Sequence, residues 1–266
     1  MSELSILLVG KVERGEFRDA PDVLERYGRV VRSDRVDDAV ALLAGGQVVA
    51  DLIAVAQAYP GEFSCESIDR MRRMAPLARV VALLGSWCEG ETRTGDPWPA
   101  AIRVYWHQWE PRAHQELDRL CRGACSAWSL PVTAGEEERL LLAADEPLAR
   151  REGLIAIVTA DFGMQEWLAA ACARRGYATV WLPAGRAVRV EGATAAVFDG
   201  DECGDDEAGR LRALAAALGH VPIVALLDFP RLDDCRRARR AGARAVLSKP
   251  LSLEDLFWQI DRVTAP

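Results

Sequence analysis

The sequence has few of the residue patterns that mark enzymes. It contains three histidines, and none stands in a motif with serine, cysteine or aspartate that would indicate nucleophilic catalysis. A glycine-rich phosphate loop is also missing, because Gly10 follows an apolar run without the rest of such a fingerprint. We therefore predict a protein without enzymatic activity.

Long apolar runs are absent too. No run approaches the roughly 18 residues that a membrane-spanning helix needs. The N-terminal MSELSILLVG has no basic segment before its apolar run and no cleavage site, so we expect a strand there and not a signal peptide. The net charge of −7 argues against a general nucleic-acid or membrane-surface binder.

The seven cysteines form no Cys-x2-Cys pair. An odd number of scattered cysteines predicts reduced thiols and a cytoplasmic protein. A zinc site is the alternative, but the spacing of its only candidate ligands disfavours it. These ligands would be Cys88, His107, Cys121 and Cys125.

Apolar runs instead alternate with helical patterns along the whole chain, which predicts parallel sheets with crossover helices. The expected strands are Ser5 to Val9, Arg29 to Arg32, Ala50 to Val55, Arg79 to Leu84 and Ala101 to Tyr105, then Leu154 to Val158, Ala178 to Leu182, Ala195 to Phe198, Val221 to Leu227 and Ala245 to Leu247. The fourth strand of each set shares a word, VVALL at 80–84 and IVALL at 223–227. We predict two copies of a flavodoxin-like, doubly wound α/β fold with strand order 2-1-3-4-5.

The predicted domains are 1–122 and 153–266, with a helical connector at 123–152. Leu140, Leu141 and Leu142 of this connector are expected to be buried between the domains. The ten residues from Pro183 to Gly192 are too few for a usual crossover helix and lack helical periodicity. One face of the second sheet is therefore expected to lack a helical cover.

The stretch from His220 to Ile260 reads as strand, helix, strand, Lys-Pro and helix, with Lys249-Pro250 after the last strand. This order resembles the last third of a CheY-like response-regulator receiver domain of two-component signalling. The resemblance implies a phosphoacceptor at Asp199, at the end of the third strand, with Lys249 contacting the phosphoryl group. It also implies that Asp161 and Asp199 could hold Mg²⁺.

The chemistry implied by this resemblance is incomplete in the second half. Ala160 stands where a second metal-holding acid is expected, and Leu227 where a hydroxyl residue is expected. Asp201, Glu202 and Asp228 are nearby acids that could partly replace the missing one.

The first half departs further from the receiver pattern. Its line ADLIAVAQAYPG is similar to a receiver's third strand, but Ala56 occupies the acceptor position. No Lys-Pro follows the fifth strand, where the sequence reads Tyr105 to Gln108. This half is interpreted as a degenerate pseudo-receiver.

Two segments are candidates for interaction. The segment Gly85 to Trp109 holds Trp87, Trp98, Trp106 and Trp109, whose rings either cover a core left bare by a lost helix or form a recognition surface. The helix around Asp233 to Ala241 carries Arg236 and Arg240 among its arginines, either as a solvated face or as a docking face for an acidic protein.

We predict a cytoplasmic, non-catalytic signalling protein that acts through protein–protein interaction, with no cofactor apart from a Mg²⁺ alternative at Asp161 and Asp199. Expected partners are a histidine kinase or another signalling protein, or a second copy in a homodimer, and neither nucleic acid nor membrane. The alternatives are an atypical phosphoacceptor at Asp199, and a small-molecule binder at the carboxyl edge of the first domain.

Overall fold

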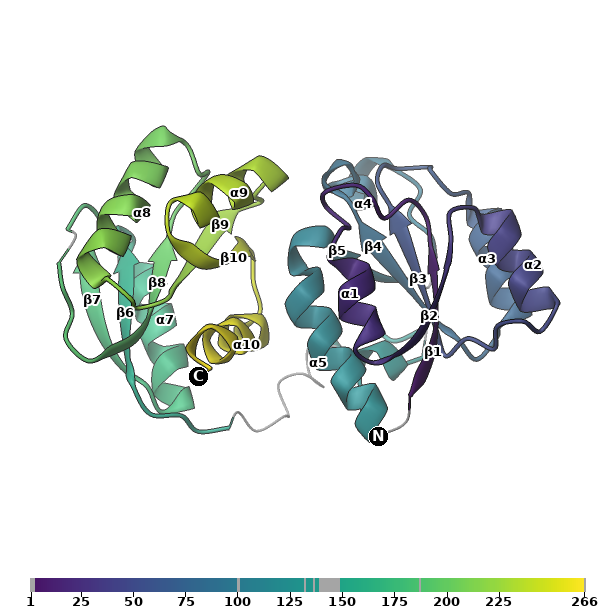
Figure 1. The fold of residues 1–266 in the computed structure, drawn as a ribbon, viewed down its shortest axis with the longest axis horizontal. Coiled ribbons are helices and arrows are strands. Elements are labelled where there is room, and N and C mark those ends of the chain that lie inside the picture. Colours follow the sequence, from purple (N-terminus) through teal and green to yellow (C-terminus); the bar gives the residue numbers. More distant parts are fainter. Residues whose placement is uncertain are drawn as a thin grey trace. The chain divides into compact units, whose positions relative to one another are not determined.

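The computed structural model of the protein describes residues 3–99, 101–131, 133–135, 137–138, 149–186 and 188–265. The chain divides into two compact units, Met1–Asp145 and Glu146–Pro266. Each unit is built around one parallel sheet with helices on both faces (Figure 1). No helix of the described residues is long and apolar enough to cross a membrane.

The first unit has the predicted strand order, β2-β1-β3-β4-β5, and all its pairs are parallel. Its strands are β1 (Leu4–Val9), β2 (Gly28–Ser33), β3 (Leu52–Gln57), β4 (Arg79–Leu84) and β5 (Ile102–Tyr105). Its main helices are α1 (Ala20–Glu25), α2 (Val36–Ala44), α3 (Cys65–Met74) and α5 (Trp109–Arg122).

Both faces of this sheet are buried, which explains why its strands are continuous apolar runs. Alternate residues of β1 point to opposite faces: Ile6 and Leu8 pack with α1 and α5, whereas Leu7 and Val9 pack with α2 and α3. The predicted helix at Pro111 begins two residues earlier, at Trp109, with the proline in the first turn, where its missing N–H costs nothing.

The second unit repeats this arrangement. Its strands are β6 (Leu154–Thr159), β7 (Ala178–Pro183), β8 (Ala193–Asp199), β9 (Ile223–Asp228) and β10 (Ala243–Lys249). They lie in the order β10-β9-β8-β6-β7, which is again 2-1-3-4-5 when counted within the unit. Both units therefore have the flavodoxin-like, receiver-like fold that the sequence predicts.

The helices of the second unit are α7 (Phe162–Arg175), α8 (Asp205–Leu218), α9 (Leu232–Arg240) and α10 (Leu253–Thr264). Helices α7 and α10 share a core over one face of the sheet, and Figure 1 shows α8 and α9 over the other. The described residues between β7 and β8 form no helix, as expected. The face of the sheet that was expected to lack a helical cover is nevertheless shielded from solvent, because Val158, Leu182 and Phe198 are buried.

The first residues of the predicted connector pack with the first unit. The short turn η3 (Ala127–Ser129) belongs to the first unit, because Trp128 is buried and stacks on Trp109 of α5 at 6.0 Å between ring centroids. The predicted burial of Leu140, Leu141 and Leu142 lies outside the described residues.

Candidate functional site

The carboxyl edge of the second sheet brings Asp199 and Lys249 together, as the resemblance implies. Asp199 ends β8 and pairs with Leu226 of the intervening strand β9, and Lys249 ends β10 and pairs with Asp228, two residues further along β9. Lys249 Nζ donates a hydrogen bond to Asp199 Oδ1 at 2.8 Å, and the two side chains are 15% and 10% exposed. A partly buried carboxylate is thus paired with a partly buried ammonium group.

Thr159 completes the environment of Asp199, and the sequence reasoning missed it. It ends β6 and is fully buried, and its hydroxyl donates to Asp199 Oδ2 at 2.6 Å. The backbone N–H of Asp161 in turn donates to Thr159 Oγ1 at 3.0 Å. Both carboxylate oxygens of Asp199 therefore have a fixed donor. The sequence feature that indicates this role is a hydroxyl residue at the end of the first strand of the unit.

Asp228 is a second partner of Lys249. Its Oδ1 lies 3.0 Å from Lys249 Nζ, and its backbone N–H donates to Asp201 O at 3.0 Å. The next residue, Phe229, has a φ of +40°, a conformation uncommon for a residue with a side chain. Asp228, the last residue of β9, thus places its carboxylate beside the lysine, whereas Leu227, just before it, is fully buried in the core.

The two carboxylates dominate the ionisation of Lys249. Burial acts to lower the pKa of its ammonium group, but the hydrogen bonds to Asp199 and Asp228 and the charges of these two groups outweigh it, and the net pKa is raised. Lys249 is therefore a fixed cation that bridges two acids.

Both carboxylates of the predicted Mg²⁺ site already accept hydrogen bonds within the chain. Asp161 is the N-cap of α7, and its Oδ1 accepts the N–H of Met164 at 2.7 Å. Asp199 already accepts from Thr159 and Lys249. The described residues contain no cluster of three or more His, Cys, Asp and Glu side chains that could hold a metal ion, and this applies equally to the zinc alternative.

Strand register places the corresponding residues of the first unit. Val9 of β1 pairs with Val55 of β3, just as Val158 of β6 pairs with Phe198 of β8. Gly10 and Ala56, the next residue on each strand, therefore stand where the second unit has Thr159 and Asp199. A Cβ at Gly10, whose φ is +107°, would lie 2.5 Å from the carbonyl oxygen of Ala56. The first unit lacks both the carboxylate and its hydroxyl donor.

Two glutamates of the first unit accept hydrogen bonds from backbone N–H groups at the carboxyl edge of its sheet. Glu16, in the loop after β1, accepts the backbone N–H of Ser86 at 3.3 Å and its hydroxyl at 2.5 Å. Glu62 accepts the N–H of Ala58, beyond β3, at 2.6 Å. The amides that follow β3 and β4 are therefore already bound to carboxylates of the same chain, which leaves an anionic ligand little to bind.

The tryptophans after β4 have two different roles. Trp98 and Trp109 are buried, and the indole N–H of Trp98 donates to Phe63 O at 2.9 Å. These two rings belong to the core and not to a recognition surface. Trp106 is half-buried, whereas Trp87 is 76% exposed. The segment includes a short α-helix, α4 (Glu91–Thr94), whose buried Glu91 binds Gln57 and Arg103.

The predicted arginines of α9 are exposed. Arg236 pairs with Asp233 at 3.3 Å on the same helix, and Arg240 is exposed in its last turn. Pairs between such exposed groups contribute little to stability, which leaves the arginines available to a partner.

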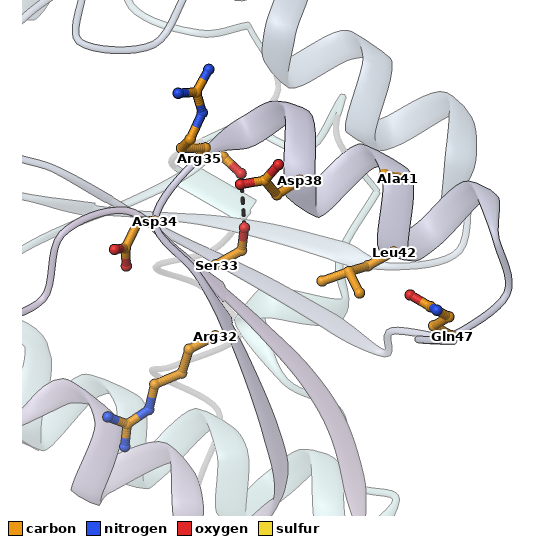
Figure 2. Close-up of a pocket in the computed structure, with 8 residues that line it drawn as sticks. All are labelled: Arg32, Ser33, Asp34, Arg35, Asp38, Ala41, Leu42 and Gln47. Carbon is orange, nitrogen blue, oxygen red and sulfur yellow. Dashed lines mark hydrogen bonds between the residues drawn. The ribbon is translucent and has the colours of Figure 1, made fainter.

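A polar groove of about 530 Å³ lies at the junction of β2 and α2 (Figure 2). Ser33 Oγ donates to the carbonyl oxygen of Arg35 at 2.8 Å, and Arg32 pairs with Glu25 outside the groove. Figure 2 shows the Arg32 and Arg35 guanidinium groups extending in opposite directions. The groove therefore has no convergent set of functional groups.

Comparisons with known proteins give similarities to solved structures. A putative pilus assembly-related protein from Burkholderia pseudomallei is 21% identical, over 42% of this chain and 89% of that one, with a TM-score of 0.38. A CheY-like response regulator from Mesorhizobium loti is 15% identical, over 42% and 99%, with a TM-score of 0.35. The E. coli RcsC C-terminus, containing a linker region and phosphoreceiver domain, is 12% identical, over 99% and 95%, with a TM-score of 0.37.

No family model matches the sequence, and neither does any curated protein. The residues of the site, and not these similarities, carry the functional conclusions.

Proposed function

We propose that the protein is a signalling regulator whose two receiver-like units act by binding other proteins, without phosphorylation of Asp199 as the main switch. The observation that carries this proposal is the closed network at Asp199. Thr159 and Lys249 each donate to one of its carboxylate oxygens, and Asp228 holds Lys249 from the other side.

Because of this network, a phosphoryl group on Asp199 would create few new contacts. A ligand shifts a conformational equilibrium only through contacts that differ between the two states. Lys249 already contacts a carboxylate on each side, and Asp228 would repel an incoming dianion. Leu227 is buried and offers no hydroxyl. The first unit has no acceptor carboxylate at Ala56.

Such a fold would then pass on a signal by binding other proteins. The exposed arginines of α9, with Arg236 and Arg240 among them, fit an acidic protein partner, and Trp87 is an exposed aromatic side chain in the first unit. All seven cysteines are free, which supports a reducing compartment such as the cytoplasm.

The test is phosphorylation of the full-length protein. It is incubated with Mg²⁺ and acetyl phosphate and examined by intact-mass spectrometry, with Asp199→Asn as the matched control. We expect substoichiometric labelling of the wild type, and no change in oligomeric state. Stoichiometric labelling that is lost in Asp199→Asn would overturn the proposal.

That result would favour the alternative function, an atypical phosphoacceptor. The observation on its side is the retained contact of 2.8 Å between Lys249 Nζ and Asp199 Oδ1. The other alternative, a small-molecule site at the carboxyl edge of the first unit, is disfavoured by the capping glutamates Glu16 and Glu62.

A further inference from the structure

A cavity of about 260 Å³ lies at the opposite, amino-terminal edge of the first sheet. It opens between the α3–β4 loop, the first residues of β4 and β5, and the segment around η3. The lining residues are Arg72, Ala75, Pro76, Leu77, Ala78, Arg79, Val80, Ile102, Trp128, Ser129, Leu130 and Pro131. This volume is slightly below the range of about 300–1,000 Å³ for ligand pockets, which favours a small molecule.

Two guanidinium groups line this cavity with incomplete partners. Arg72 Nη1 lies 3.4 Å from Asp69 Oδ1, but its Nη2 is buried without a hydrogen-bond partner. Arg79 Nε is also buried without a partner, and no carboxylate of the described residues pairs with this arginine. Guanidinium groups form charge-assisted hydrogen bonds with carboxylates, so an anion bound in the cavity would pair with the two arginines that line it.

The remaining wall is apolar and held in place. Trp128 is buried against Trp109, and its backbone N–H donates to Glu116 and Ser126. Leu77 at the rim is 92% exposed and adds apolar surface at the opening of the cavity. The cavity therefore combines a fixed apolar surface with a positively charged end.

We propose that this cavity binds a small organic carboxylate, with its anionic group against Arg72 and Arg79 and its apolar body against Leu77, Ile102 and Trp128. Arg72 and Arg79 carry two positive charges and Asp69, which pairs with Arg72, carries one negative charge, so the three groups sum to +1 and match a monocarboxylate. A phosphate dianion would retain excess charge beside the apolar wall.

This site is independent of the protein-binding role proposed above. It would give the first unit, which has no acceptor carboxylate, an input of its own at the edge opposite the capped one.

The test is titration of the full-length protein with phenylacetate, followed by two-dimensional NMR of the backbone amides. We expect saturable shifts at Leu77 to Val80 and at Ser129 and Leu130. The neutral analogue phenylacetamide should bind at least about 10-fold more weakly, because it cannot form charge-assisted hydrogen bonds. Inorganic phosphate alone should bind more weakly than phenylacetate.

The variants are Arg79→Gln and Arg72→Gln, each expected to weaken phenylacetate binding about 10-fold. Arg73→Gln is the matched control, because Arg73 is exposed on α3 and does not line the cavity. If the arginine variants fail to fold, Leu77→Asp tests the same site from its exposed rim and should weaken binding by charge repulsion. Equal binding of phenylacetamide, unchanged binding in the folded variants, or no saturable shifts would each overturn the proposal.

Discussion

Asp199 lies at the centre of a set of polar side chains that satisfy one another. A carboxylate that is only 10% exposed needs donors, because burial removes most of its hydration. Thr159 supplies a neutral donor and Lys249 a charged one, and Asp228 shares the charge of the lysine. Each of these side chains is a hydrogen-bond or ion-pair partner of another, so removing one leaves its neighbour without that partner.

Thr159→Val should destabilise the second unit by about 1–3 kcal/mol, because it leaves one oxygen of a buried carboxylate without its donor. Urea unfolding monitored by circular dichroism measures the change. Thr179→Val in β7 is the matched control, since the Thr179 hydroxyl has no hydrogen-bond partner among the described residues. Equal losses in both variants would contradict a role for the Thr159 hydroxyl.

Lys249 should make the stability of the protein depend on alkaline pH. Because its pKa is raised in the folded state, its contribution is fully present below the unfolded pKa of about 10.4 and is lost as the pH rises through the folded pKa. Lys249→Met should remove this part of the loss of stability at alkaline pH. Chemical denaturation of both proteins from neutral pH upward measures it, and parallel curves for the two would contradict the assignment.

At the scale of elements, the two sheets differ mainly in the loops that follow their strands. The loop after β1 carries Glu16 across to the turn after β4, whereas the loop after β6 is short and turns at once into the capped helix α7. The two sheets therefore share a strand order but differ in the side chains at their carboxyl edges, because loops on a rigid scaffold vary independently of it.

Glu16→Ala should destabilise the first unit by about 1 kcal/mol, since Ser86 loses the acceptor for its N–H at the start of η1 (Ser86–Cys88). Hydrogen exchange followed by mass spectrometry should show faster exchange at 85–88 and no change in the second unit. Glu13→Ala, at an exposed position in the same loop, is the control. Unchanged exchange at Ser86 would mean that Glu16 is not its cap.

Across the whole molecule, burial decides which of the seven thiols can react. Burial raises the pKa of Cys88 and Cys172 to about 11 and that of Cys235 to about 12, which suppresses the reactive thiolate at neutral pH. Cys125 is exposed and Cys65 is half-buried.

Native labelling with a maleimide should therefore modify Cys125 first and Cys65 more slowly, and the other five only after unfolding. Peptide mapping over time measures the order, and Cys125→Ser should remove the fast phase. Early modification of Cys172 or Cys235 would show that the second unit opens more readily than its packed core indicates.

The sequence by itself determined the fold and one central pair. Alternating apolar runs fix parallel strands, and the shared VVALL and IVALL words mark the duplication. The resemblance to receiver domains implied that Asp199 and Lys249 lie together, which fits the meeting of the carboxyl ends of parallel strands at one edge of a sheet. The missing acceptor at Ala56 was also indicated by the sequence, because ADLIAVAQAYPG is similar to a receiver's third strand and has alanine at the acceptor position.

The tertiary structure decided which polar groups meet. Thr159 lies 40 residues from Asp199 and Glu16 lies 70 residues from Ser86, and no local pattern relates either pair. The resemblance implies a metal-binding role for Asp161, and only the structure shows that its side chain caps α7. The burial of Trp98 and Trp109 likewise depends on how loops close over the core. These outcomes rest on loop conformation and side-chain direction, which strand and helix periodicities do not specify.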